Sequence, residues 1–264
     1  GLFKLGSDQL PVEVAGVPPD YFSEDGQLWG NPLYDWKALK ADGYRWWIQR
    51  FEQNFRLFDV ARLDHFRGFV DYWSVPAGAE TAKAGNWQKG PRSDLFKAVF
   101  EALPEVKIIA EDLGLIGDDV RRFRDKLGLP GMAILHFAFD LGSDNLYLPH
   151  NLTANSVVYP GTHDNNTTQG WYEEAPPEIQ DQVRRYLRIS GQDISWDLIR
   201  AAYRSVSRLA IIPMQDLLAL DSDARMNRPG SEQGNWQWRM TNSQFSWQLG
   251  SAAYLRELAW LYGR

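Results

Sequence analysis

The stretch ARLDHFRG at residues 61–68 is one of three places in this chain where an apolar, strand-like run ends in a carboxylate. The other two are IIAEDLG at residues 108–114 and YPGTHDN at residues 159–165. In a barrel of alternating strands and helices, the carboxyl ends of the strands gather on one face, and that face carries the active site. A pair of carboxylates flanking a glycosidic bond is enough for glycoside chemistry. The three stretches therefore predict an enzyme that processes glycans.

The neighbouring residues suggest a role for each acid. Arg62 lies two residues before Asp64, on the same face of a strand, where its guanidinium would keep the carboxylate ionised and oriented. Glu111 follows an apolar run, and partial desolvation would raise its pKa and suit it to acid–base work. His163 offers hydrogen-bond donors beside Asp164. If the three acids stand at the carboxyl ends of strands, we expect them to converge on one pocket.

Each of these residues also has a purely structural interpretation. A single acid at a strand end is usually a helix N-cap or a solvated loop residue. Arg62 and Asp64 alone would form a structural ion pair, and His163 alone would be a hydrogen-bonded structural histidine. Asp112 is a second candidate for the role of Glu111, although the alternation of side chains in a strand lets only one of the two face the pocket.

Composition narrows the class of ligand. The net charge of −6 argues against nucleic acid and anionic membranes as partners, because both bind basic surfaces. There is no cysteine, which excludes disulfides, zinc–thiolate sites and cysteine nucleophiles and fits a cytoplasmic location. The 12 Trp residues supply flat faces that can stack on sugar rings, although most Trp residues fill cores.

Several other chemistries leave no trace in the sequence. There is no phosphate-binding loop, HExxH motif, EF-hand loop or nucleophile elbow. The four His residues are scattered, so no metal cluster is apparent. No secretory leader opens the chain, and no apolar run approaches the length of a membrane span.

The order of apolar runs predicts an α/β fold, because strands separated by helices favour a parallel sheet covered by helices. The expected strands begin near Val60, Val106, Met132, Val157 and Leu209. The expected helices span residues 35–58, 93–103, 118–127, 177–189, 194–208 and 247–261. Residues 1–36 and 70–91 should be irregular or loop, because Pro and Gly punctuate them. A closed (β/α)8 TIM-type barrel needs eight strands, so the roughly five strands here predict an incomplete barrel in one catalytic domain over residues 1–264.

The three acidic stretches closely resemble those of the 4-α-glucanotransferases, or amylomaltases, of glycoside hydrolase family 77. The same likeness extends to PDYFS (19–23), GQLWGNPLYDW (26–36), LPGM (129–132) and ARMNRPG (224–230). The resemblance covers nearly the whole chain, and the segments around Trp29 and Asn227 are specific to the amylomaltases. It implies a TIM-type barrel without a separate C-terminal domain. It also implies a retaining transfer of α-1,4-glucan segments through a covalent glycosyl-enzyme, with no metal or organic cofactor.

The resemblance also implies a role for each matching residue. Asp64 matches the nucleophile, Glu111 matches the acid/base, and Asp164 matches the third acid, which grips sugar hydroxyls and stabilises the transition state. The residues that match the substrate site are Arg62, His163, Trp29 and Asn227. The segments around Trp29 and Asn227 match loops that arch over the cleft and favour a sugar acceptor over water.

Length is the one departure from the family, whose members are roughly twice as long. We therefore expect that the chain lacks the first barrel strands and is poorly active alone, because a barrel with missing strands has open edges. The missing N-terminal barrel segment is then a possible partner. Two other functions stay open from the sequence. One is an α-glucan hydrolase of the same clan, and the other is a glucan-binding fragment without catalysis.

Overall fold

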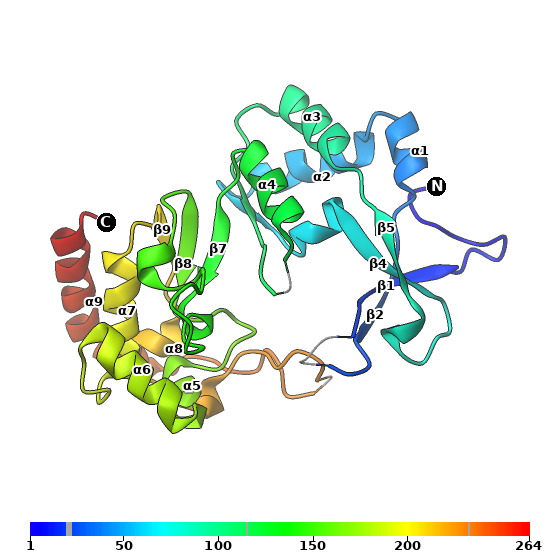
Figure 1. Ribbon diagram of the computed structural model, residues 1–264. Helices are drawn as coiled ribbons and strands as arrows, with labels where there is room; N and C mark the ends of the chain where they lie inside the picture. Colours follow the sequence, from blue (N-terminus) through cyan, green and yellow to red (C-terminus); the bar gives the residue numbers. More distant parts are fainter. Residues whose placement is uncertain (20–22, 115, 232) are drawn as a thin grey trace. The chain divides into compact units, whose positions relative to one another are not determined.

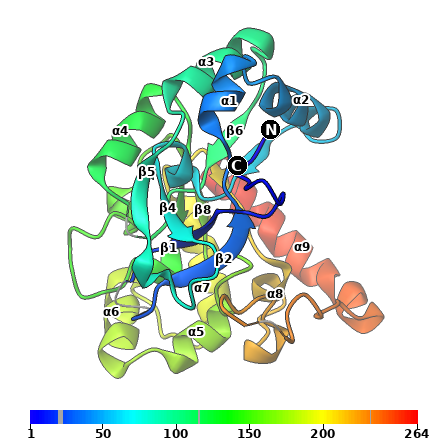
Figure 2. The same ribbon diagram turned by 90° about the vertical axis from the view of Figure 1, so that its right-hand side faces the viewer.

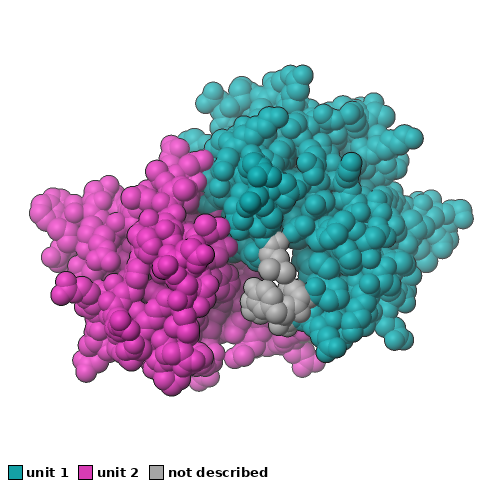
Figure 3. All heavy atoms as spheres, in the orientation of Figure 1, with its two compact units in different colours: residues 1–131 teal, residues 132–264 magenta. Residues whose placement is uncertain are grey.

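The computed structural model describes residues 1–19, 23–114, 116–231 and 233–264, and for residues 246–249 it describes the backbone alone. The chain divides into two units, residues 1–131 and residues 132–264, drawn in teal and magenta in Figure 3. Each unit has a hydrophobic core of its own. Three residues of the PDYFS stretch, Asp20, Tyr21 and Phe22, lie outside the described residues.

An antiparallel sheet in the first unit has four strands in the order β2-β1-β4-β5 (Figures 1 and 2). The strands are β1 (Glu13–Val17), β2 (Gln27–Pro32), β4 (Asp71–Pro76) and β5 (Asn86–Lys89). The expectation of irregular chain over residues 1–36 and of loop over residues 70–91 is therefore wrong. Glycine and proline weaken the local strand signal in both segments, but pairing between strands overrides it, as where Trp73 lies opposite Trp87.

Two parallel strands of the first unit lead to the first two acids. β3 (Ala61–Leu63) pairs with β6 (Ile108–Ala110), and Leu63 lies opposite Ala110. Both strands are shorter than the runs at residues 60–66 and 106–113 that the sequence predicts as strands. β3 ends because His65 takes a left-handed conformation with a φ of 46°, which a strand cannot continue through.

The helices of the first unit are α1 (Trp36–Ala41), α2 (Arg45–Phe55), α3 (Ser93–Ala102) and α4 (Asp118–Lys126). The single helix expected over residues 35–58 is two helices, because Gly43 and Tyr44 have φ angles of 69° and 58° that break the α-helical path. The core between the helices and the parallel pair is aromatic, and the rings of Phe66 and Phe96 lie 5.7 Å apart. Burial of such rings is the main stabilising contribution in this unit.

The second unit contains a three-stranded sheet in the order β7-β8-β9, in which β8 and β9 are parallel. The strands are β7 (Gly131–Ile134), β8 (Ser156–Tyr159) and β9 (Leu209–Ala210). The helices are α5 (Thr168–Glu174), α6 (Pro177–Leu187), α7 (Ile194–Arg204), α8 (Met214–Leu217) and α9 (Asn242–Tyr262). Helix α5 is not expected from the sequence. Helix α9, red in Figure 2, begins earlier than expected because Thr241 and Gln244 form a capping box at its N-terminus.

Short 3-10 helices join several of these elements: η1 (Phe66–Phe69), η2 (Ala82–Ala84), η3 (Leu135–Phe137), η4 (Pro149–Asn151) and η5 (Ser222–Ala224). The mixed α/β fold is confirmed, and a strand lies at each of the five expected places. No closed barrel is seen in the described part of the chain, where the parallel pairs belong to separate two- and three-stranded sheets, and the incomplete TIM-type barrel stays a prediction. Within the described ranges no helix combines the length and apolar character needed to cross a membrane.

Candidate active site

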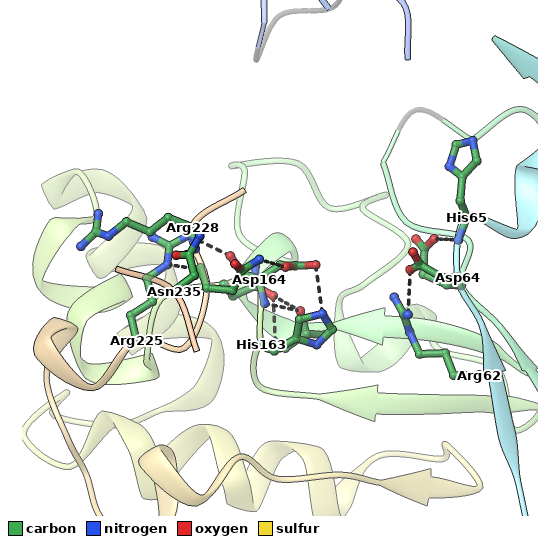
Figure 4. A network of polar contacts seen from close by, with 12 residues as sticks. Arg62, Asp64, His65, His163, Asp164, Arg225, Arg228 and Asn235 are labelled. Atoms are coloured by element: carbon green, nitrogen blue, oxygen red, sulfur yellow. Dashed lines mark hydrogen bonds and ion pairs between the residues drawn. The ribbon is translucent and has the colours of Figure 1, made fainter. Parts of the chain in front are cut away.

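Asp64 follows β3 directly, and its side chain is 80% exposed. Its Oδ1 accepts a hydrogen bond from Nη1 of Arg62 at 2.7 Å, as the spacing of two residues along one strand predicts (Figure 4). The guanidinium orients the carboxylate. A carboxylate that is oriented and accessible can act as a nucleophile.

Glu111 follows β6, and both of its carboxylate oxygens accept backbone hydrogen bonds. Oε2 accepts from the His65 amide at 2.7 Å, and Oε1 accepts from the Leu113 amide at 2.9 Å. His65 is the residue after Asp64, so the Glu111 carboxyl group lies beside the chain segment that carries the other acid. Burial raises the pKa of Glu111, the charge of Asp64 raises it further, and the two amides and Arg62 lower it. A raised pKa suits a group that has to donate a proton near neutral pH.

Asp112, the alternative to Glu111, points the other way. It is buried and forms an ion pair with Nη1 of Arg124 on α4. A Cβ added at Gly131 would lie 2.8 Å from Asp112 Oδ2, so this glycine leaves the room that the ion pair occupies. Strand alternation thus gives the two neighbouring acids different surroundings, and Glu111 is the one on the side of Asp64.

Trp29 and His65 form an aromatic contact beside Asp64. Trp29 is exposed on β2, and its ring meets the imidazole of His65 edge-on, with centroids 4.8 Å apart. Burial lowers the pKa of His65 to about 4, and Arg67 acts in the same direction, whereas Asp64 and Asp71 oppose it. The imidazole is therefore neutral at pH 7. Trp29 is one of the residues predicted for the substrate site, whereas His65, next to the acid in the same motif, was not predicted.

In the second unit, Asp164 lies between β8 and α5, and contacts with Asn227, Arg225 and His163 hold its oxygen atoms (Figure 4). Its Oδ1 accepts a hydrogen bond from Nδ2 of Asn227 at 2.6 Å, and its backbone oxygen accepts one from Nη2 of Arg225 at 2.8 Å. Its Oδ2 lies 3.4 Å from Nε2 of His163. Asn227 is 63 residues away in sequence, and its contact with Asp164 brings together two of the predicted site residues.

A tight turn fixes the backbone around Asp164. Oδ1 of Asn165 accepts hydrogen bonds from the amide and the hydroxyl of Thr162, at 2.8 and 2.9 Å. The Asn165 amide in turn donates to the Thr162 carbonyl at 3.1 Å. The Asp164 side chain remains 44% exposed. The turn therefore presents an oriented acid to a ligand.

Two residues near Asp164 were missed by the sequence analysis. Arg225 belongs to the ARMNRPG stretch, so its place two residues before Asn227 was the available signal. Trp236 is exposed, and its ring centroid lies 5.3 Å from that of His163. Its φ of 62° is rare for a bulky residue and is typical of a functional loop. The sequence signal for Trp236 was its place in the polar segment 221–238, which is rich in Gly, Asn and Trp.

The predicted site residues thus fall into two groups. Asp64, Glu111, Arg62 and Trp29 belong to the first unit, and Asp164, His163 and Asn227 belong to the second. The first group combines two carboxylates with Arg62 and the exposed Trp29, and the second combines Asp164 with His163 and Asn227 beside the exposed Trp236. Such groups are suited to sugar hydroxyls and sugar faces. Among the described residues no three His, Cys, Asp or Glu side chains are grouped in a way that could hold a metal ion.

Comparison with known sequences gives a consistent result. The family model for 4-alpha-glucanotransferase matches residues 1–244. The chloroplastic/amyloplastic 4-alpha-glucanotransferase of Arabidopsis thaliana is 50% identical over 264 residues, which cover 99% of this chain and 46% of the plant protein. The 4-alpha-glucanotransferase of Thermus thermophilus is 49% identical, with 97% of this chain and 53% of that protein covered. The chain spans about half the length of the relatives that it matches.

Two solved structures are similar as well. The amylomaltase of Streptococcus agalactiae, in complex with acarbose, matches with a TM-score of 0.95 and 41% identity, covering 100% of this chain and 53% of that one. The amylomaltase of Corynebacterium glutamicum matches with a TM-score of 0.71 over 85% of this chain and 38% of that one. Its identity of 18% supports likeness of fold alone.

Proposed function

Because the chain belongs to the 4-alpha-glucanotransferase family, we propose that it carries the catalytic acids of an enzyme that transfers α-1,4-glucan segments between maltodextrins. The observation that carries this proposal is the pairing of an exposed, Arg-bound Asp64 with a Glu111 of raised pKa on adjoining strands. These are the two states that a retaining glycoside mechanism requires of its nucleophile and its acid.

In the proposed first step, a carboxylate oxygen of Asp64 attacks the anomeric carbon of the donor glucan. The bond from that carbon to the glycosidic oxygen breaks, and Glu111 gives its proton to the leaving oxygen. In the second step, the 4-hydroxyl of an acceptor sugar attacks the same carbon, Glu111 takes the hydroxyl proton, and the bond to Asp64 breaks. Two inversions retain the α configuration. No cofactor is needed in either step.

The remaining site residues are proposed to bind the glucan. The hydrogen bond of Asp164 with Asn227 and its contact with His163 support a role in holding sugar hydroxyls, with Asp164 stabilising the positive charge of the transition state. Arg62 orients the nucleophile. The exposed ring of Trp29 is suited to stack on a sugar face. The acarbose complex of the S. agalactiae amylomaltase supports an α-glucan as the ligand class, and the cysteine-free composition supports a cytoplasmic setting.

Incubation with maltotriose tests the proposed function. The intact protein should release glucose and produce a ladder of longer glucans, because an acceptor sugar takes the place of water in the second step. A hydrolase of the same clan would yield only shorter products. A glucan-binding chain without catalysis would bind maltotriose and leave it unchanged. Thin-layer or ion-exchange chromatography of the products distinguishes the three outcomes.

Arg62 provides a test through the pH profile. Burial raises the pKa of Glu111, and the charge of Arg62 is one of the causes that lower it. Glu111 must be protonated in the first step, so kcat/KM falls as pH rises through its pKa. Arg62→Met removes a positive charge that lowers the pKa of Glu111, so the basic limb of the pH profile should move to higher pH. Arg121→Met, which removes an arginine paired with Asp118 on α4, is the matched control and should leave the limb in place. An unmoved limb in Arg62→Met would contradict the assignment of Glu111 as the acid.

A further inference from the structure

His136 is a buried histidine that the proposed reaction does not use. It lies in η3, directly after β7, and is almost entirely removed from solvent. Its contacts reach both ends of the segment between β8 and α5, residues 160–167, which carries Asp164 and is called the Asp164 loop below. A single side chain therefore lies against the start and the end of the loop that presents one of the three proposed catalytic acids.

At the start of the Asp164 loop, the backbone and the ring of His136 both make contact. The His136 amide donates to the carbonyl of Pro160 at 3.0 Å. Gly161 follows, and a Cβ added there would lie 2.6 Å from Cε1 and 2.8 Å from Nδ1 of the imidazole. Any larger residue at this position would displace either the ring or the loop. The glycine thus allows the chain to lie directly on the imidazole edge.

At the end of the Asp164 loop, the same ring contacts helix α5. Nε2 of His136 lies 2.9 Å from the hydroxyl of Thr168, the first residue of the helix. The imidazole is stacked on the indole of Trp171, with centroids 4.6 Å apart and an interplanar angle of 5°. Thr168 also contacts α8, because its amide donates to Oδ1 of Asp216 at 2.8 Å.

The protonation state of His136 fits this arrangement. Burial lowers the pKa of His136 to about 3, so the ring is neutral at pH 7. Nδ1 has no hydrogen-bond partner, which favours the tautomer with the proton on Nε2, where it can be donated to the Thr168 hydroxyl. The Thr168 side chain in turn hydrogen-bonds Asp216. Successive hydrogen bonds from His136 to Thr168 and from Thr168 to Asp216 therefore hold the end of the Asp164 loop in place.

We propose that His136 is a positioning residue for Asp164, because it clamps the Asp164 loop at Pro160 and Gly161 on one side and at Thr168 and Trp171 on the other. This inference rests on the proposed role of Asp164 in stabilising the transition state. It predicts that loss of the clamp lowers kcat more than it raises KM, because a misplaced group that acts in the transition state affects the chemical step.

His136→Phe tests the clamp directly in the intact protein. Phenylalanine keeps a flat ring against Trp171 and removes the hydrogen bond to Thr168. Hydrogen exchange of peptides that cover residues 160–168 should become faster, and exchange of other peptides in the second unit should not. Val183→Ala on α6 is the control, because it removes volume from the same core without touching the loop. Unchanged exchange in residues 160–168 would overturn the proposal, whether or not the protein shows transferase activity.

Kinetics then test the link to Asp164. His136→Phe should lower kcat for transfer about tenfold or more with KM within about twofold, since small misplacements of catalytic groups cost factors of this size. Val183→Ala should retain kcat. In an Asp164→Asn background, His136→Phe should cost less than about twofold, because the group that it positions is gone. An undiminished loss in that background, or an unchanged kcat beside faster exchange, would overturn the inference. If the wild type produces no glucan ladder, it is the proposed function that fails, and exchange still tests the clamp.

Discussion

Asp64→Asn is expected to reduce transfer between maltodextrins by about 10⁴-fold or more, the scale seen when a nucleophile is removed from a site that acts as a unit. The asparagine side chain keeps the shape of the aspartate but cannot form the ester to the anomeric carbon. The loss should appear in kcat, measured as glucose released from maltotriose, while maltotriose binding is retained. Retained transfer in this variant would contradict the proposed nucleophile.

The chain offers a closely matched control for this substitution. Asp118 has a side chain that is 80% exposed, as Asp64 does, and its Oδ1 is also paired with an arginine, Arg121, at 3.3 Å. Asp118→Asn removes one negative charge from a site on α4 with the same exposure and an arginine partner, and it should leave transfer unchanged. A loss of similar size in both variants would assign the effect to charge or folding rather than to chemistry.

Glu111→Gln separates the acid from the nucleophile. It should lower transfer from maltotriose by roughly 10²- to 10⁴-fold, the usual contribution of a general acid. With an α-maltosyl fluoride donor, fluoride leaves without a proton, so the first step should proceed in Glu111→Gln and remain blocked in Asp64→Asn. Equal defects of the two variants on the fluoride would exclude the division of roles proposed for them.

Asp216→Asn is expected to change the pH dependence of stability by about 3 kcal/mol. Burial raises the pKa of Asp216 to about 6, whereas an ordinary aspartate has a pKa of 3.8. Because folding raises this pKa, the folded protein is most favoured below pH 3.8, and the free energy of unfolding falls as pH rises through 6. The gap between the two pKa values corresponds to about 3 kcal/mol. The asparagine keeps an oxygen for the Thr168 amide and does not titrate.

Urea unfolding of both proteins at about pH 4 and about pH 7 measures the effect. The free energy of unfolding of the variant, relative to that of the wild type, should be higher at pH 7 than at pH 4 by about 2 kcal/mol, because at pH 4 the unfolded aspartate is already more than half ionised. Comparison at each pH cancels the contribution of other titrating groups such as His136. Asp118→Asn, which removes an exposed acid, is the control. A relative stability that does not change with pH, or that changes in the opposite direction, would contradict a raised pKa of the buried Asp216 carboxyl group.

The sequence predicted the parallel strands better than the antiparallel ones, for a physical reason. β6 and β8 are fully buried and read as continuous apolar runs, which a single sequence displays well. β2 is exposed along almost its whole length, and its glycine and proline are typical of turns. Such a strand exists because β1 pairs with it, and this pairing outweighs the weak strand preference of its own residues.

The site shows the same division between local and long-range information. Asp64, Glu111 and Asp164 were predicted because each ends an apolar run within its own motif. His65 was missed because its role depends on a Trp29 ring that comes from another sheet, and Trp236 because its partner His163 lies far away in the chain. His136 was not predicted either, because the sequence does not distinguish a histidine that only fills the core from one that positions a loop. Contacts over long sequence separations are what the structure adds.

The close approach of Gly161 to the imidazole of His136 has a consequence for how this enzyme family evolves. A methyl group at position 161 would lie 2.6 Å from the ring, so the two positions share one fixed volume although 25 residues separate them. A lineage that gains a side chain at the first position must lose bulk at the second. Homologous sequences should therefore substitute the two sites in step, and a mutational library should yield larger residues at 161 only among members with a small residue at 136.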